Sequence, residues 1–228
     1  MTMPVAEPIA GTKRKVFVVD DHAIVREGLT LLINREADLT VCGVADEMHS
    51  ALRTIESMRP DIVIVDISLN GPDGLDLLKT IRTKDPSLPV LILSMHDESI
   101  YAERALRAGA NGYIMKQEAT DRVLVALRRI LNREVYVSDR IANTMLQRLA
   151  GLSKAREQSP VDVLSDRELE VLRLIGEGRS TRAIAEMLHL SVKTVESYQS
   201  HLKEKLGLRN SRELFQYAIE FSLRDVRE

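Results

Sequence analysis

The sequence predicts a doubly wound α/β domain with a five-stranded parallel sheet, followed by a small all-α domain of four helices. In the first half, five short runs rich in Val, Ile and Leu alternate with helical patterns. In the last third, four helical patterns follow one another without a strand-like run between them. Alternation of the first kind is typical of βαβ units with helices on both faces of a sheet. A chain of 228 residues is long enough for two such domains.

The strand-like runs of the first half are short and almost continuously apolar, as expected for parallel strands that are buried on both faces. They lie near residues 15–19, 39–44, 61–65, 90–93 and 112–115, and the helical patterns among them include 24–34, 99–108 and 121–131. Right-handed crossovers between parallel strands favour the flavodoxin-like order, in which the first and third strands are neighbours. The residues that follow these two strands should therefore meet at one edge of the sheet.

Charged or hydroxyl-bearing side chains directly follow four of the five strand-like runs. Asp20 and Asp21 close the first run, Asp66 the third, Ser94 the fourth and Lys116 the fifth. A single Asp in such a place is usually a turn former or helix cap. Clustered carboxylates repel one another, however, so a hard divalent cation such as Mg²⁺ would hold them ionised. With a hydroxyl and an ammonium at the same edge, the pattern predicts a metal-assisted phosphoryl site.

With these motifs in this order, residues 14–131 resemble the receiver domain of bacterial two-component response regulators. The resemblance implies a set of functional residues at the carboxyl edge of the sheet. They are the phosphoacceptor Asp66, the Mg²⁺ ligands Asp20, Asp21, Asp66 and the backbone carbonyl of Ser68, and the switch residues Ser94, Lys116 and Tyr113. Carboxylate attack on a phosphoryl group requires alignment and positive charge rather than a strong base, which agrees with these roles.

The loop after Asp66 departs from the family pattern, because Asn70 stands where relatives usually carry Pro. Its effect on loop stiffness and on the phosphoryl lifetime is left open. Ser68 and His96 occupy positions that the resemblance associates with dephosphorylation, although polar loop residues are often simply solvated. An aspartyl phosphatase would carry a second acid where Ser68 stands. We therefore expect no free-standing enzyme, only assistance to the receiver's own phosphotransfer and dephosphorylation.

The last third carries start and stop signals for four helices. Ser165 to Glu168 read as a capping box that opens the first helix. A second helix is expected over 181–188, Ser191 should cap a third that ends at Gly207, and Asn210 can cap a fourth. Four helices of this length form a small independent domain.

Residues 164–219 look like a LuxR-type helix-turn-helix domain, through segments that include Leu164–Glu168, Lys193–Val195 and Lys205–Gly207. Together the two halves resemble the NarL/FixJ class of response regulators. The resemblance implies that the third helix enters the major groove of DNA. Six residues are expected to contact DNA: Glu196, Ser197 and Ser200 near base edges, and Lys193, Thr194 and Lys203 near phosphates. Tyr198, on the apolar stripe of this helix, is expected to be a core residue.

Glu196 is an unusual residue for a DNA-binding face. Its carboxylate repels phosphates but can accept a hydrogen bond from cytosine N4. It should therefore contribute more to base selectivity than to binding affinity. Pairing within the helix with Lys203 or Ser200 is the alternative. Residues 161–228 carry 11 Lys plus Arg against 12 Asp plus Glu, which is less basic than many nucleic-acid binders. We expect modest affinity for a monomer, strong salt dependence, and a gain from dimerisation.

These readings divide the chain into a disordered extension at 1–13, a receiver at 14–134, a helical linker at 135–160 and a DNA-binding domain at 161–228. No apolar segment is long enough to span a bilayer and the first residues do not read as a signal peptide, so a cytoplasmic protein without a membrane partner is expected.

The predicted function is that of a phosphorylation-controlled transcriptional regulator. A sensor histidine kinase would phosphorylate Asp66, Ser94 would be drawn inward, and Tyr113 would follow. The receivers would then dimerise on double-stranded DNA, or a masked recognition helix would be released; RNA polymerase is a further candidate partner. The alternative is a receiver that acts through protein–protein interaction without sequence-specific DNA binding. The kinase, stimulus, operator and direction of regulation are not specified by the sequence.

Overall fold

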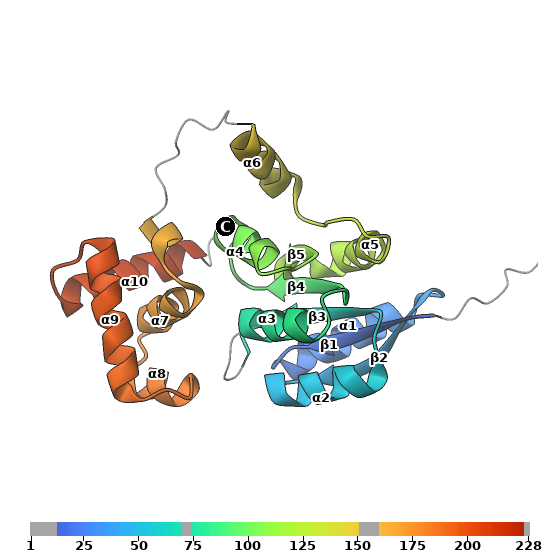
Figure 1. Ribbon diagram of the computed structural model, residues 1–228, viewed down its shortest axis with the longest axis horizontal. Coiled ribbons are helices and arrows are strands. Elements are labelled where there is room, and N and C mark those ends of the chain that lie inside the picture. The colour runs from blue at the N-terminus through green and yellow to red at the C-terminus, as the bar shows by residue number, and fades with distance from the viewer. Residues whose placement is uncertain (1–12, 70–73, 151–159, 226–228) are drawn as a thin grey trace, which may run out of the picture.

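The computed structural model describes residues 13–69, 74–150 and 160–225. A five-stranded sheet with its helices lies beside a separate group formed by the four helices α7 to α10 (Figure 1). The first part comprises β1 Arg14–Val19, α1 Ala23–Asn34, β2 Leu39–Ala45, α2 Met48–Met58, β3 Ile62–Asp66, α3 Gly74–Lys84, β4 Val90–Ser94, α4 Glu98–Arg107, β5 Gly112–Met115, the 3-10 turn Lys116–Glu118 and α5 Ala119–Leu131. Then follow α6 Asp139–Leu149, the 3-10 turn Pro160–Val163, α7 Asp166–Gly176, α8 Thr181–Met187, α9 Val192–Leu206 and α10 Ser211–Asp225.

The sheet is parallel throughout, with the strand order β2-β1-β3-β4-β5. This confirms the doubly wound fold and the predicted neighbourhood of the first and third strands. Val19 stands opposite Val65 in the β1–β3 register, and Asp66 stands opposite Leu93 of β4. The side chains that follow β1, β3 and β4 therefore emerge at the same edge.

Alternate residues of the central strands feed two cores, one on each face of the sheet. Val16 and Ile64 pack on one face with α1 and α5, and Phe17 and Val65 pack on the other with α2, α3 and α4. All four of these side chains are fully or almost fully buried. Burial on both faces explains why the strands read as continuous apolar runs rather than as alternating ones.

The helices of the last third begin and end at the cap residues predicted from the sequence. Ser165 Oγ accepts a hydrogen bond from the Glu168 amide, and the Glu168 carboxylate accepts one from the Ser165 amide, which confirms the capping box. Gly207 ends α9 with a φ of 68°, a conformation that glycine adopts without steric cost. Asn210 Oδ1 accepts from the amides of Arg212 and Glu213 at the start of α10.

The connection between the two parts includes α6, at the place that the sequence predicts. Arg140 of α6 forms an ion pair of 3.0 Å with Glu98 at the start of α4. The predictions for the extension 1–12, for Asn70 and for the linker residues 151–159 concern positions outside the described residues. Within the described ranges, no helix combines the length and hydropathy that a membrane crossing requires.

Candidate phosphorylation site and DNA-binding surface

The acids and the lysine predicted from the strand ends meet in one cluster. Lys116 Nζ lies 2.8 Å from Asp66 Oδ2 and 2.7 Å from Asp20 Oδ2, and all three side chains are buried. β1 and β3 deliver the acids, while the turn after β5 delivers the lysine. The amides of His22 and Ser68 each donate to one of the two carboxylates, at 2.9 and 3.2 Å. One ammonium therefore holds two carboxylates in place at the carboxyl edge of the sheet.

The residues of this cluster fit a hard divalent cation. Possible ligand atoms of Asp20, Asp21, His22 and Asp66 all lie within 4.8 Å of one another. Asp20 Oδ2 and Asp21 Oδ1 are buried, and neither makes a hydrogen bond of normal geometry with the described residues, although each has a cationic or imidazole nitrogen within 2.7 Å. Buried carboxylate oxygens without hydrogen bonds are costly unless a cation coordinates them. The donor set, dominated by carboxylates, agrees with Mg²⁺.

Burial controls the ionisation of Asp66. It raises the pKa of Asp66 to about 6, because the attraction of Lys116 is outweighed by desolvation together with the repulsion from Asp20. The pKa of Lys116 is raised despite its own burial, since two carboxylates favour the charged ammonium. The two raised pKa values are compatible. Lys116 lies beside two carboxylates that favour its charged form, whereas Asp66 shares this single ammonium with Asp20.

The predicted switch residues Ser94 and Tyr113 are joined through His96. The His96 amide donates to Ser94 Oγ at 3.1 Å, and the hydroxyl of Tyr113 donates to the His96 carbonyl at 2.8 Å. Tyr113 is 1% exposed, so its ring already occupies the inward position that the sequence analysis gave to the phosphorylated state. Ser68 Oγ lies 2.7 Å from His96 Nε2, which brings together two residues that the sequence singled out separately.

Two features of this region were missed from the sequence. His22 Nδ1 lies 2.6 Å from Asp21 Oδ1 and 3.3 Å from Asp20 Oδ1; its place directly after two acids was an available signal. The second is a set of contacts from α3 and α4 to the start of α7, including Lys79 to Asp166 at 2.6 Å. A contact between residues 87 positions apart cannot be predicted from a local sequence pattern.

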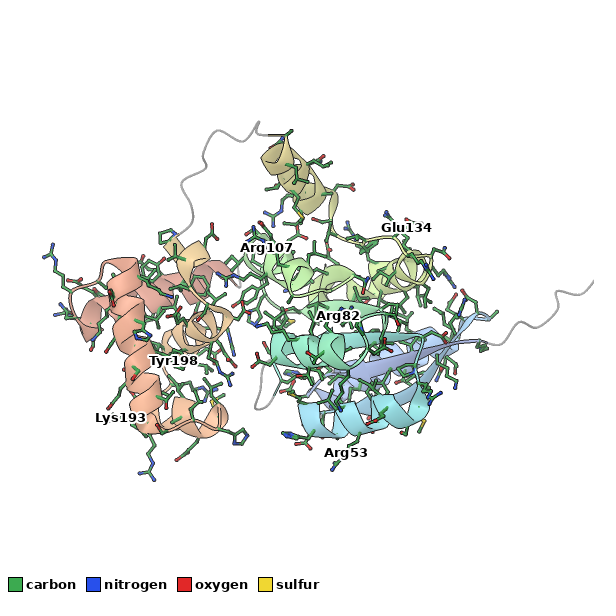
Figure 2. The ribbon with its side chains drawn as sticks, in the orientation of Figure 1. Arg53, Arg82, Arg107, Glu134, Lys193 and Tyr198 are labelled. Atoms are coloured by element: carbon green, nitrogen blue, oxygen red, sulfur yellow. The ribbon has the colours of Figure 1, made fainter. Side chains whose placement is uncertain are left out.

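The DNA-binding candidates form an outer face of α9. Four of the six candidates are exposed to solvent with the receiver present: Lys193, Glu196, Ser197 and Ser200. The other two, Thr194 and Lys203, are half-buried. On the opposite side of this helix, Val195 and Leu202 are fully buried. Tyr198, the expected core residue, is half-buried against the core, as is Leu206. Lys193 projects away from the domain in Figure 2, whereas Tyr198 lies on the side of α9 that faces α7. No described residue of the receiver covers this face.

The polar side chains of α9 are arranged along the helix. Thr194 Oγ1 lies 2.7 Å from Ser191 Oγ at the N-terminal cap. Ser197 Oγ donates to the Lys193 carbonyl, and Ser200 Oγ donates to the Glu196 carbonyl, both at 3.0 Å. Neither Lys203 nor Ser200 pairs with the Glu196 carboxylate among the described contacts. The carboxylate is therefore available on the outer face.

A receiver-type sheet with a carboxylate cluster and a lysine, joined to a four-helix domain with an exposed third helix, defines the class of two-component response regulators. The family model described as a response regulator receiver domain matches residues 16–128, and the model for bacterial regulatory proteins of the luxR family matches residues 162–218. The two matches coincide with the sheet domain and the helical domain.

Sequence similarity to a known relative extends along almost the whole chain. The oxygen regulatory protein NreC of Staphylococcus aureus is 35% identical over 213 residues, which cover 92% of this chain and 98% of NreC. The chain therefore belongs to the NarL/FixJ family of response regulators, which join a receiver to a LuxR-type DNA-binding domain.

Solved structures agree with this assignment. A LuxR-family response regulator from Aurantimonas sp. SI85-9A1 is 34% identical, with a TM-score of 0.57, over 61% of this chain and 99% of that one. RcsB from Salmonella enterica serovar Typhimurium, bound to the promoter P1flhDC in the presence of the phosphomimetic BeF3⁻, is 27% identical, with a TM-score of 0.66, over 91% of this chain and 98% of RcsB.

Proposed function

We propose that Asp66 accepts a phosphoryl group from a sensor histidine kinase and that this modification controls binding of double-stranded DNA by α9. The observation that carries the proposal is the contact of Lys116 Nζ with both Asp66 and Asp20 at the carboxyl edge of the sheet. Cationic groups that are fixed where negative charge develops are the main requirement of phosphoryl transfer. The proposal includes the division into receiver 14–134, linker 135–160 and DNA-binding domain 161–228.

In the proposed reaction, a carboxylate oxygen of Asp66 attacks the phosphorus of a phosphohistidine. An O–P bond forms as the N–P bond breaks, and the kinase imidazole leaves with the electron pair and takes up a proton. Asp20, Asp21, Asp66 and the Ser68 carbonyl would hold Mg²⁺, which offsets charge on the phosphoryl oxygens when bound. Lys116 neutralises a further oxygen, and Ser94 Oγ supplies a hydroxyl donor.

For DNA binding, we propose that α9 lies in the major groove, with Glu196, Ser197 and Ser200 towards base edges and Lys193, Thr194 and Lys203 towards phosphates. The exposure of four of these six side chains supports the proposal. A homodimer would place two such helices on paired half-sites, and the solved structure of two RcsB dimers bound to two parallel DNAs supports this assembly. The recognition helix is exposed, so dimerisation is favoured over unmasking. A cytoplasmic location and contact with RNA polymerase follow from this role.

The proposal is tested by selection from a random duplex-DNA pool at fixed moderate salt. The chain is compared with and without Mg²⁺ and beryllium fluoride, a mimic of the phosphoryl group. We expect a paired site to be enriched mainly with the mimic in the wild type and no such gain in Asp66→Asn. Equal enrichment under both conditions would show that the receiver does not gate binding. Absence of any enriched site would favour the protein-interaction alternative.

A further inference from the structure

His22 directly follows the two acids at the end of β1 and stands at the N-terminal cap position of α1. A residue at this position usually turns a side-chain oxygen towards the first amides of the helix. The His22 side chain makes no such bond. Its Nδ1 lies instead beside two carboxylates, 2.6 Å from Asp21 Oδ1 and 3.3 Å from Asp20 Oδ1. The imidazole is therefore directed at the carboxylate cluster rather than at the helix that it opens.

Two nitrogens hold the three acids of the cluster in the same manner. Lys116 Nζ lies between Asp66 and Asp20, at 2.8 and 2.7 Å. His22 Nδ1 lies between Asp20 and Asp21, so acids and nitrogens alternate along one chain of contacts. Within the described part of the chain, no other Lys, Arg or His nitrogen is within ion-pair distance of Asp21. The position of this second acid therefore depends on His22.

The chemistry of the contact identifies the ring as a hydrogen-bond donor. An ionised carboxylate only accepts, so Nδ1 has to carry the ring proton in order to bond either acid, and a neutral imidazole is sufficient. The contact with Asp20 already has hydrogen-bond geometry, whereas that with Asp21 is close but not aligned. The His22 ring is 58% exposed and the Asp21 side chain 13% exposed. A small rotation of the ring, which has room to move, would align the second bond.

We propose that His22 is a positioning residue for the divalent cation, because its Nδ1–H holds the Asp20 and Asp21 carboxylates together. The inference rests on the proposed role of these acids as Mg²⁺ ligands. Adjacent carboxylates repel each other and would separate towards solvent without a donor between them. Mg²⁺ demands near-ideal octahedral geometry, so displaced ligands bind it less tightly. Hydrogen-bond partners of metal ligands commonly contribute about 10- to 100-fold to metal affinity.

Direct ligation of the cation by the ring is the competing arrangement, and two observations favour positioning. Imidazole is a typical ligand of transition metals, whereas Mg²⁺ takes oxygen ligands. Neighbouring ligands of an octahedral ion with bonds of about 2.1 Å are about 3.0 Å apart. The separation of 2.6 Å between His22 Nδ1 and Asp21 Oδ1 is shorter than this and matches a hydrogen bond to a carboxylate.

The test measures binding of Mn²⁺, as a probe of the site, to the full-length chain at one fixed pH. The electron paramagnetic resonance signal of the free ion reports binding, and Mg²⁺ is added as a competitor. His22→Leu removes the donor and keeps the bulk. His22→Asn places an amide N–H where Nδ1 stands, whereas His22→Ser is able to cap α1 but is too short to reach the acids. His49→Leu, at an exposed position of α2, is the matched control.

We expect His22→Leu and His22→Ser to bind both ions about tenfold more weakly, and His22→Asn and His49→Leu to remain within about twofold of the wild type. Labelling of His22→Leu by acetyl phosphate should be slow at low Mg²⁺ and should reach the wild-type rate at saturating Mg²⁺. This restoration is expected because His22 acts on occupancy of the site and not on the transfer step.

Wild-type affinity in His22→Leu or His22→Ser, or equal losses in His22→Asn and His22→Leu, would overturn the positioning role. Nitrogen modulation in the electron spin echo of bound Mn²⁺ that disappears in His22→Leu would also overturn it, because the ring would then be a ligand. Failure of the proposed metal site is distinguished by Asp21→Asn, which would then bind Mn²⁺ as tightly as the wild type.

Discussion

Lys116 Nζ lies 2.8 Å from Asp66 Oδ2, and both side chains are almost completely withdrawn from solvent. The pair brings together the ends of β3 and β5, which are not neighbours in the sheet. The lysine also contacts Asp20, so the same ammonium stabilises two carboxylates. The chemistry and the stability of the site should therefore both depend on these residues.

Replacement of Asp66 by Asn should stabilise the fold at neutral pH when no divalent cation is present. The folded-state pKa of Asp66, about 6, exceeds the ordinary aspartate value of 3.8, so the folded chain binds the proton more tightly than the unfolded chain. The free energy of unfolding of the wild type should consequently fall as pH rises from about 4 to about 6, and remain lower above that range. We expect Asp66→Asn to be more stable at pH 7.5 by up to about 3 kcal/mol.

Urea unfolding at pH 4, 5.5 and 7.5 in EDTA measures this effect. Asp46→Asn, at an exposed position after β2, is the control and should follow the wild-type curve. Added Mg²⁺ should reduce the advantage of the Asn variant. A gain in stability that persists unchanged at pH 4 would contradict the ionisation argument.

Replacement of Lys116 by Met should slow phosphorylation of Asp66 severely. The substitution keeps the length of the side chain but removes the cation that would neutralise a phosphoryl oxygen, and such groups contribute about 100-fold in rate. The measurement is the initial rate of labelling by acetyl phosphate. Lys84→Met, on the exposed end of α3, controls for loss of a positive charge. Equal rates for Lys116→Met and the wild type would remove Lys116 from the mechanism.

Replacement of Glu196 by Ala should broaden base preference more than it weakens binding. Its carboxylate is exposed and able to accept a hydrogen bond from cytosine N4, while it repels phosphates. We expect discrimination at one position of the site to fall by about tenfold or more, which corresponds to about 1–3 kcal/mol. Sequencing of DNA selected by the variant gives the comparison, with Glu204→Ala on the same helix as the control. An unchanged preference profile would assign the specificity to other residues.

Replacement of Ser165 by Ala should destabilise the helical domain by about 1 kcal/mol, because the first amides of α7 lose their cap. Ser211→Ala provides the matched control, since the cap of α10 comes from Asn210 instead. Thermal unfolding followed by circular dichroism should show a lower midpoint for the first variant only. Similar midpoints for both variants would mean that the capping box contributes little.

The strand and helix positions were predictable because they depend on local patterns. The runs ending at Val19, Val65 and Leu93 are apolar on both faces, and Ser165, Ser191 and Asn210 are the cap residues from which helices begin. Handed crossovers then left few strand orders, which placed Asp20 beside Asp66 without knowledge of any side-chain contact.

The sequence by itself therefore determined the fold class, the edge that carries the acids and the helix that we propose faces DNA. Only the tertiary structure decided that Lys116 bridges two carboxylates, that Ser68 pairs with His96, and that α7 docks beside them. The last contact joins Lys79 to Asp166 across 87 positions. Periodicity fixes which face of an element is buried, but the partner of a polar side chain depends on how whole elements pack, and that information is not local.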